Sequence, residues 1–434
     1  MDSNDRKEKL KEAIRLLHSG VSIEEIKERY GDFLQSVNPV DIPVIEQELL
    51  REGLPINDIL RLCDLHVELF RKSLESKELK DVPKGHPLDL LLKENEMILK
   101  DAEGLSLFSQ ALVKSNQERR DFLLNSLKGY LSELKKKIRT HYRKNQMVLF
   151  PYLERRGIIA IPRVLWGRED QTLGKIRELE KLFNEGVEEE QLLNKISSAS
   201  LEISRDVADL VFRENKILYP TLWTLLGEGE WVAISQLCDE LGYILPIKET
   251  DWKSDAEPIL PYQIKAEISP YEAERLPAEV RNLISSAQPE DYNVKNEGDI
   301  ELSTGFLSVE QLEGILKSIP IELTFADANN RIKFFSKSRL TGGFPRSKSI
   351  IGRKLEFCHP PRLENYVRLN VNLLKEGKAD FREFWTRSGD RIIRVLVAGI
   401  KGKNGEYIGT LEMVEDLTDI LKDPEGILKK IVVL

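Results

Sequence analysis

Side chains suited to metal, redox or nucleophilic chemistry are scarce in this chain, which has five histidines and three cysteines among 434 residues. Cys63 and His66 lie three residues apart in a helical pattern, so both would project from one helix face and offer two metal ligands. Cys358 and His359 are adjacent, and either could bind a cofactor by ligating haem iron, while the thiol could respond to redox state. In both places the simpler interpretation is structural, with the cysteine packed in a core.

Other motifs and the bulk composition narrow the function further. The sequence contains no P-loop, G-x-S-x-G elbow, dinucleotide-binding fingerprint or kinase signature, so we expect no enzyme activity. A net charge of −8 argues against binding to nucleic acid or to an anionic membrane. The three cysteines are widely separated, and the sequence shows neither a secretory leader nor an apolar run long enough to span a bilayer. These features predict a cytoplasmic protein.

The elements that must position these residues follow from the periodicity of apolar side chains. Helical spacing predicts four long amphipathic helices, over residues 86–114, 117–148, 168–185 and 188–218, and four such helices indicate an up-down bundle with room for a metal or ligand between them. Short helices are expected before the bundle and a chain segment rich in proline and charge after it. The predicted domains are a small helical domain (1–80), a bundle (82–235), a linker (236–300) and a C-terminal domain (301–425).

The predicted C-terminal domain carries alternating apolar and polar residues. Strands are expected over residues 321–326, 332–335, 381–386, 392–400 and 407–416, with turns at Asn329-Asn330, Ser388-Gly389-Asp390 and Lys403-Asn404-Gly405. The fold class is therefore multidomain and mainly α, with a C-terminal α+β domain built on an antiparallel sheet.

Four strings of the middle region resemble the successive helices of hemerythrin-like, HHE cation-binding domains: HPLDLLLKEN (86–95), HYRKNQMVLFPYLERRGI (141–158), VLWGREDQ (164–171) and FRENKILYP (212–220). Two of them contain an apolar-aromatic-proline sequence. The resemblance implies a four-helix bundle with a non-haem iron site of histidines and carboxylates.

The ligand set of this family is degenerate here, because residues 82–235 contain only the histidines His86 and His141. Asp89 stands where the family often has histidine, Asn145 and Gln146 replace an expected carboxylate, and Glu169 follows the Trp-Gly motif in place of histidine. One interpretation is a remodelled site that holds one metal, iron or zinc. The alternative is a bundle kept as a scaffold, and haem ligation by either histidine is a further option. The candidate metal ligands are His86, Asp89, His141, Glu169 and Glu214.

Resemblances also extend to both ends of the chain. The N-terminal strings EAIRLLHSG (12–20), EQELLREGLP (46–55) and RLCDLHVELF (61–70) resemble a domain of unknown function that precedes hemerythrin-like domains in prokaryotes. The C-terminal strings PIELTFADANNRIKFFSKS (320–338), IIGRKLEFCHPP (350–361) and the segment 381–420 resemble a PAS domain. That resemblance implies a pocket for a small molecule, haem or flavin, or a dimerisation role.

Together these features favour a cytoplasmic sensor or regulatory protein. It would respond to a small ligand, a gas or redox state, and would signal to a protein partner or a second copy through its PAS and helical domains, because no output domain is visible. The alternative is a non-haem metal-binding protein that handles oxygen, nitric oxide or iron in the bundle. The cofactor is unassigned, with iron in the degenerate site or haem or flavin in the PAS pocket as the options.

Overall fold

The computed structural model describes residues 3–35, 45–49, 52–54, 79, 81–184, 190–246, 251–264, 289, 292–337 and 346–432. The chain forms two compact units, Met1–Tyr292 and Asn293–Leu434. None of the helices in the described part has the length and apolar character needed to cross a membrane.

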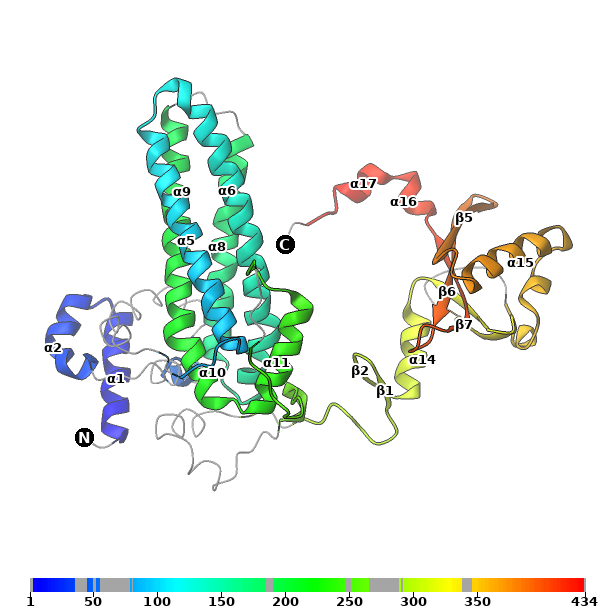
Figure 1. Ribbon diagram of the computed structural model, residues 1–434, viewed down its shortest axis with the longest axis horizontal. Coiled ribbons are helices and arrows are strands. Elements are labelled where there is room, and N and C mark those ends of the chain that lie inside the picture. The colour runs from blue at the N-terminus through cyan, green and yellow to red at the C-terminus, as the bar shows by residue number, and fades with distance from the viewer. Residues whose placement is uncertain are drawn as a thin grey trace. The chain divides into compact units, whose positions relative to one another are not determined.

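The first unit is built around four long helices that run side by side (Figure 1). They are α5 (Pro87–Val113), α6 (Gln117–Lys144), α8 (Ala160–Asn184) and α9 (Glu190–Arg213). Helix α5 contacts α6 and α9, and α8 contacts the same two helices, so the four close into a bundle. In α5 the buried side chains recur every three or four residues, as at Ile98, Ala102 and Leu105, which gives the helix one stripe for the core. The four-helix bundle expected from the sequence is confirmed, although α8 begins at Ala160 rather than near 168.

Two of the bundle helices contain a π-helical turn just before a proline. In the second helix, η1 (Asn145–Leu149) links α6 to α7 (Phe150–Arg155), and in the fourth, η2 (Glu214–Leu218) links α9 to α10 (Tyr219–Leu225). Pro151 and Pro220 lack a backbone N–H, so each disrupts the regular ladder, and the wider turn accommodates one extra residue. The repeated aromatic-proline sequence thus marks two bulges at the same level of the bundle.

After α10, helix α11 (Glu228–Leu241) packs on α5, α6 and η1. The chain then continues through residues 242–246 and 251–264, which we call the strap. The strap has little regular structure apart from the short 3-10 helix η3 (Pro261–Gln263), yet it lies against the bundle: the Ile259 amide donates to Gly229 O (2.9 Å) and the Tyr152 hydroxyl to Ile259 O (2.9 Å). A linker was expected over 236–300, and its first described part belongs to the bundle unit.

The N-terminal helices α1 (Ser3–His18) and α2 (Ile23–Gln35) also belong to the first unit. Leu10, Ile14 and Ile26 are buried where these two helices pack together. Lys11 forms ion pairs with Glu48 and Glu52, which ties α1 to the residues that follow α2. Cys63 and His66 lie outside the described residues.

The second unit opens with a hairpin of β1 (Ile300–Leu302) and β2 (Gly305–Leu307), followed by helix α14 (Val309–Ser318). Its centre is a five-stranded antiparallel sheet in the order β4-β3-β7-β6-β5. The chain ends with the short helices α16 (Thr418–Lys422) and α17 (Pro424–Leu428). The strands are β3 (Glu322–Asp327), β4 (Ile332–Phe335), β5 (Phe381–Ser388), β6 (Arg391–Lys401) and β7 (Tyr407–Asp416).

All five strands fall where alternation of apolar residues predicted them. Asn330, with φ at +58°, and Gly389 and Gly405, with φ at +64° and +81°, form the predicted turns. Between β4 and β5 lie the 3-10 helices η4 (Lys348–Ile350) and η5 (Leu355–Cys358) and helix α15 (Pro361–Lys375). Helix α15 covers one side of the sheet, since a side chain at Gly399 would meet Leu374.

Candidate functional site

A group of buried polar side chains lies inside the bundle at the level of the two π-helical turns. At its centre, His141 of α6 has no exposed surface and sits between two carboxylates. Its Nδ1 is 2.6 Å from Glu94 Oε2 of α5, and its Nε2 is 2.9 Å from Glu214 Oε2 of η2. Three of the four bundle helices therefore meet at one imidazole.

Amide side chains from the first π-helical turn bring the remaining bundle helix, α8, into this group. Asn145 Nδ2 donates to Glu214 Oε1 (2.9 Å) and to Glu169 Oε1 (3.3 Å), and Gln146 Nε2 donates to Glu169 Oε2 (2.7 Å). The hydroxyl of Tyr219 lies 3.2 Å from His141 Nε2 and 3.4 Å from Glu214 Oε2. The π-helical turn is what aims Asn145 and Gln146 inward at consecutive positions.

A second buried cation, Lys144, completes the group. Its side chain has no exposed surface, and its Nζ donates to Glu94 Oε1 (2.8 Å) and to the Gly242 carbonyl (2.8 Å). The ammonium group also lies 5.0 Å from the centre of the Tyr243 ring, a cation-π contact. We call the whole group the charged cluster: Glu94, His141, Lys144, Asn145, Gln146, Glu169, Glu214 and Tyr219.

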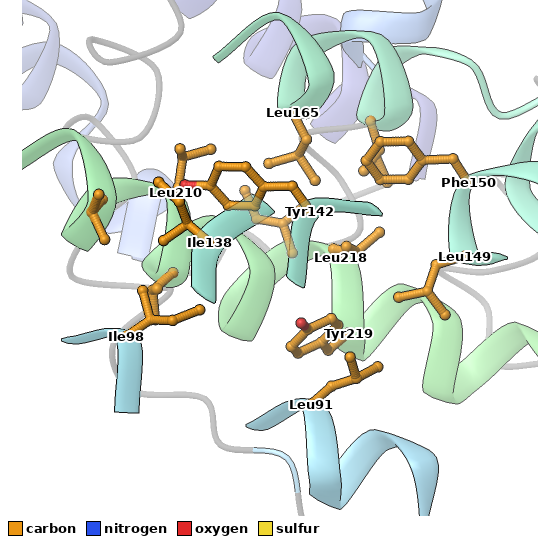
Figure 2. Close-up of a cluster of buried hydrophobic side chains, with 14 of the residues drawn as sticks. Leu91, Ile98, Ile138, Tyr142, Leu149, Phe150, Leu165, Leu210, Leu218 and Tyr219 are labelled. Atoms are coloured by element: carbon orange, nitrogen blue, oxygen red, sulfur yellow. The ribbon is translucent and has the colours of Figure 1, made fainter. Parts of the chain in front are cut away.

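The charged side chains of the cluster are fully buried within the bundle unit. Figure 2 shows part of the apolar core of that unit, with Leu91 near the ring of Tyr219 and with Ile138, Leu149 and Leu218 in the same cluster. All of these side chains are buried. Because water is excluded, interactions among the charges are strong and any unpaired charge would be costly.

Burial and neighbouring charge together set the protonation states. Burial alone would lower the pKa of His141, but Glu214 and Glu94 outweigh it and raise that pKa to about 9. Burial, reinforced by Glu214, raises the pKa of Glu169 to about 8. Burial opposes ionisation of Glu94 as well, yet His141 and Lys144 hold its pKa below the usual value. At neutral pH His141 is therefore a cation between Glu94 and Glu214, Glu94 is ionised, and Glu169 keeps its proton.

The other two candidate ligands lie apart from these contacts. His86 is the N-cap of α5, where its Nδ1 accepts a hydrogen bond from the Leu88 amide (3.1 Å). Its ring is surrounded by three tryptophans, with ring centres 5.2 Å away at Trp223 and 4.8 Å away at both Trp231 and Trp252. Burial in this aromatic setting lowers the pKa of His86 to about 4, so the ring is neutral at pH 7.

Asp89 likewise serves the start of the helix. Its Oδ2 accepts from the Gly85 amide (2.8 Å) and from Lys93 Nζ (2.9 Å). A carboxylate in the first turn is favoured by the helix dipole. The structure thus brings His141, Glu169 and Glu214 together and gives His86 and Asp89 the role of capping α5.

Family comparisons agree with this architecture. Residues 86–222 match the hemerythrin HHE cation-binding domain, residues 312–418 a PAS domain, and residues 10–76 DUF438, a family of unknown function. The chain therefore combines DUF438, hemerythrin-type and PAS domains. No curated protein matches the chain.

Two solved structures are similar to parts of the chain. A C-terminal domain from Streptococcus mutans is 30% identical, with a TM-score of 0.27, and the match covers 29% of this chain and 96% of that one. A sensory box sensor histidine kinase from Vibrio cholerae is 12% identical, with a TM-score of 0.20, and the match covers 24% of this chain and 88% of that one.

As its side chains are arranged, the hemerythrin-type domain does not fit a metal. Each oxygen of Glu94, Glu169 and Glu214 accepts a hydrogen bond within the protein. Both ring nitrogens of His141 face carboxylate oxygens, at 2.6 Å from Glu94 and 2.9 Å from Glu214, so neither faces an open coordination position. In the described part of the chain, no group of three or more His, Cys, Asp or Glu side chains is placed to hold an ion. Metal binding by the five candidate residues stays a prediction.

In the PAS domain, Cys358 and His359 end the short helix η5. Cys358 lies at the surface. Neighbouring atoms still shield its thiol in part from water, and this raises the pKa of the thiol and disfavours the reactive thiolate. His359 Nδ1 lies 3.1 Å from the Leu355 carbonyl, within its own short helix. These contacts are local, and ligation of a cofactor by either residue stays a prediction.

Glu94 and Lys144, which contribute the most buried ion pair of the site, were not among the residues expected from the sequence. Both stand in helical segments as ordinary charged residues. One signal was available: Glu94-Asn95 repeats as Glu214-Asn215, and the structure pairs the two asparagines, with Asn95 Nδ2 donating to Asn215 Oδ1 (2.8 Å).

Proposed function

We propose that this chain is a sensor or regulatory protein whose PAS domain takes a small polar ligand and whose state is passed on through protein contacts. The observation that carries the proposal is the polar lining of the helix-covered side of the PAS sheet. Register places Glu412 and Thr324 on the same side as Gly399, beneath α15. A polar lining favours a small charged or hydroxylated molecule over a large apolar cofactor.

Three features of this lining support recognition of a polar molecule. Arg346 donates to Glu322 (2.6 Å) and to Glu412 (2.8 Å), which joins two neighbouring strands. Asn370 of α15 is buried and accepts from Arg382 Nε (2.9 Å). The Thr324 hydroxyl is buried and has no hydrogen-bond partner within the described residues, so it is available to a ligand.

The opposite side of the sheet supports a partner contact. Four residues paired across neighbouring strands face this side: Phe325, Leu411, Ala398 and Phe381. Along each strand they alternate with the residues that face α15. Phe381 is 61% exposed and Trp385, further along the same strand, is 52% exposed. Aromatic side chains exposed on one side of a sheet are typical of an interaction surface.

The test of the proposal begins with the full chain purified from its own cells. Elemental analysis and an ultraviolet-visible spectrum should show no stoichiometric iron, haem or flavin, and native mass spectrometry should detect a retained small molecule. A Thr324→Val variant should lose that molecule, whereas Thr140→Val, whose hydroxyl bonds to a carbonyl of its own helix α6, should retain it. Stoichiometric iron that disappears in His141→Ala would overturn the proposal in favour of a non-haem metal-binding protein.

A further inference from the structure

The charged cluster touches the strap directly. Glu94 Oε1 accepts from Lys144 Nζ (2.8 Å) and also from the backbone amide of Ile244 (2.9 Å). Lys144 Nζ in turn donates to the carbonyl of Gly242. One buried ion pair therefore holds both a donor and an acceptor of the strap backbone.

Further along, the strap is held by contacts of a different kind. Trp252 packs against His86, which caps the helix that carries Glu94. Gly229 of α11 lies so close to the strap that a Cβ atom there would come within 2.5 Å of the Glu257 carbonyl. Arg155 Nε donates to the Ile264 carbonyl (3.2 Å). Lys84 also pairs with Asp251 of the strap (3.5 Å), but both of these side chains are largely exposed, so such a pair contributes little. The charged cluster therefore provides the buried ionic attachment of the strap.

We propose that Glu94 and Lys144 latch the strap to the bundle, so that a change at the charged cluster is passed to the chain segment that leads to the PAS domain. The inference rests on the proposed sensory function and assigns the bundle a place in it. Glu94 is shared among His141, Lys144 and the strap, so anything that draws its carboxylate toward another partner must weaken the hold on Ile244. The coupling is reciprocal, because a strap that leaves also removes a donor from Glu94 and an acceptor from Lys144.

The experiment measures hydrogen exchange of the full chain by mass spectrometry in peptides that cover residues 242–246. Glu94→Gln keeps the shape of the side chain but removes the charge that accepts from Lys144 and Ile244. Lys144→Met removes the ammonium group and keeps the apolar stem. The matched control is Lys137→Met, which breaks the ion pair of Lys137 with Asp101 between the same two helices, where no strap contact is made among the described residues.

We expect exchange in residues 242–246 to quicken by at least tenfold in both cluster variants and by less than twofold in the control, while peptides from α9 keep their protection. Unchanged exchange in 242–246 in either folded cluster variant would overturn the latch. If Glu94→Gln does not fold, Lys144→Met decides alone. If both fail to fold, Ile244→Pro replaces them, because proline lacks the amide that donates to Glu94. Loss of the latch would leave the PAS ligand test untouched, so the two proposals can fail separately.

Discussion

His141 has a raised pKa inside the charged cluster, and the sign of its effect on stability follows from its two carboxylate partners. Its folded-state pKa is about 9 against an ordinary 6.5, so the folded protein holds a proton that the unfolded chain releases between these values. The contribution of this residue to the free energy of unfolding is fully present below about pH 6.5. It is lost as the pH rises to about 9, by roughly 1.4 kcal/mol per pH unit.

We therefore expect the free energy of unfolding of the bundle to fall between pH 6.5 and 9 in urea titrations. His141→Gln should be destabilised by about 3–5 kcal/mol at pH 6.5, because it leaves the buried carboxylate of Glu214 without its cationic partner, while Glu94 keeps Lys144. Its profile should lack most of the fall seen in the wild type. A wild-type profile that is flat or rising over this range would contradict the protonated state of His141.

Glu169 gives a second prediction. Its pKa is raised, which is the opposite of the usual shift for a carboxyl group in a folded protein. Its pKa is about 8, so the folded state keeps a proton that the unfolded chain loses above about pH 4.5, and stability falls as pH rises between these values. Glu169→Gln stays neutral at every pH. The difference in free energy of unfolding between this variant and the wild type should therefore shift in favour of the variant by about 1–3 kcal/mol from pH 5 to pH 9. Glu178→Gln, on the exposed side of the same helix, should change stability by less than about 0.5 kcal/mol at both pH values.

How much of the charged cluster could be predicted depended on residue type. Histidine is rare in this chain, so His141 stood out, and Glu169 and Glu214 followed from the family resemblance. Glu94 and Lys144 could not be separated from the many other charged residues, because a sequence contains no measure of burial and most glutamates and lysines lie at the surface. His86 was placed with the metal ligands because the sequence does not show what surrounds a side chain. In the structure its ring packs against Trp223, Trp231 and Trp252, which come from segments far away in sequence.

At the scale of elements, the π-helical turn η1 sets the rotation of the second bundle helix. A π-helical turn holds one residue more than the α-helical turn it replaces. Removal of that residue therefore rotates the helix on one side of the turn by about 100° relative to the helix on the other side. Deletion of Met147, which is 56% exposed, should restore a regular helix and swing His141 away from the side that buries Phe150 and Tyr152.

We expect this deletion to cost at least about 4 kcal/mol in urea denaturation followed by circular dichroism, at the upper end of single changes. Met147→Ala keeps the extra residue and loses only exposed surface, so it should cost less than about 0.5 kcal/mol. Equal effects of the two changes would show that the bulge itself is dispensable.

Gly229 tests the packing of the strap on α11. Alanine normally stabilises a helix by about 0.5–1 kcal/mol relative to glycine, and Gly129→Ala, with open space around its Cβ position, should show that gain. Gly229→Ala should instead lose about 1–3 kcal/mol, because its methyl group would collide with the Glu257 carbonyl and Ile259. A red shift of tryptophan emission as Trp252 leaves its aromatic neighbours would accompany the loss, and stabilisation by both alanines would contradict the packed strap.

The elements themselves were largely predictable. Strict alternation located β3 to β7, and helical spacing located the bundle, since both patterns are local. The start of α8 was missed because Gly157 and Pro162 are typical of irregular segments, although proline is compatible with the first turn of a helix. The strap was expected only as a linker, because its attachment depends on Glu94, Tyr152 and Gly229, which are remote in sequence.

At the scale of the whole molecule, the division at Tyr292 predicts that the two units unfold separately. Each has its own apolar core, one inside the bundle and one around Ala326, Ile332, Leu355 and Val371, and separate cores need not melt together. We expect two transitions in scanning calorimetry. His141→Gln should lower only the first unit's transition, and Arg346→Met, which breaks the bridge to Glu322 and Glu412, only that of the second.

Independence of the two units also defines what the strap can transmit. If both variants shifted both transitions, the units would share a stabilising interface, and a signal could pass between them without the strap. If each variant shifts one transition alone, no stabilising interface couples the two units. A signal from the charged cluster can then reach the PAS domain only along the chain, through residues 242–292, and the latch on Glu94 lies at the beginning of this segment. Calorimetry of these two variants thus decides whether the strap is a required path or one of two.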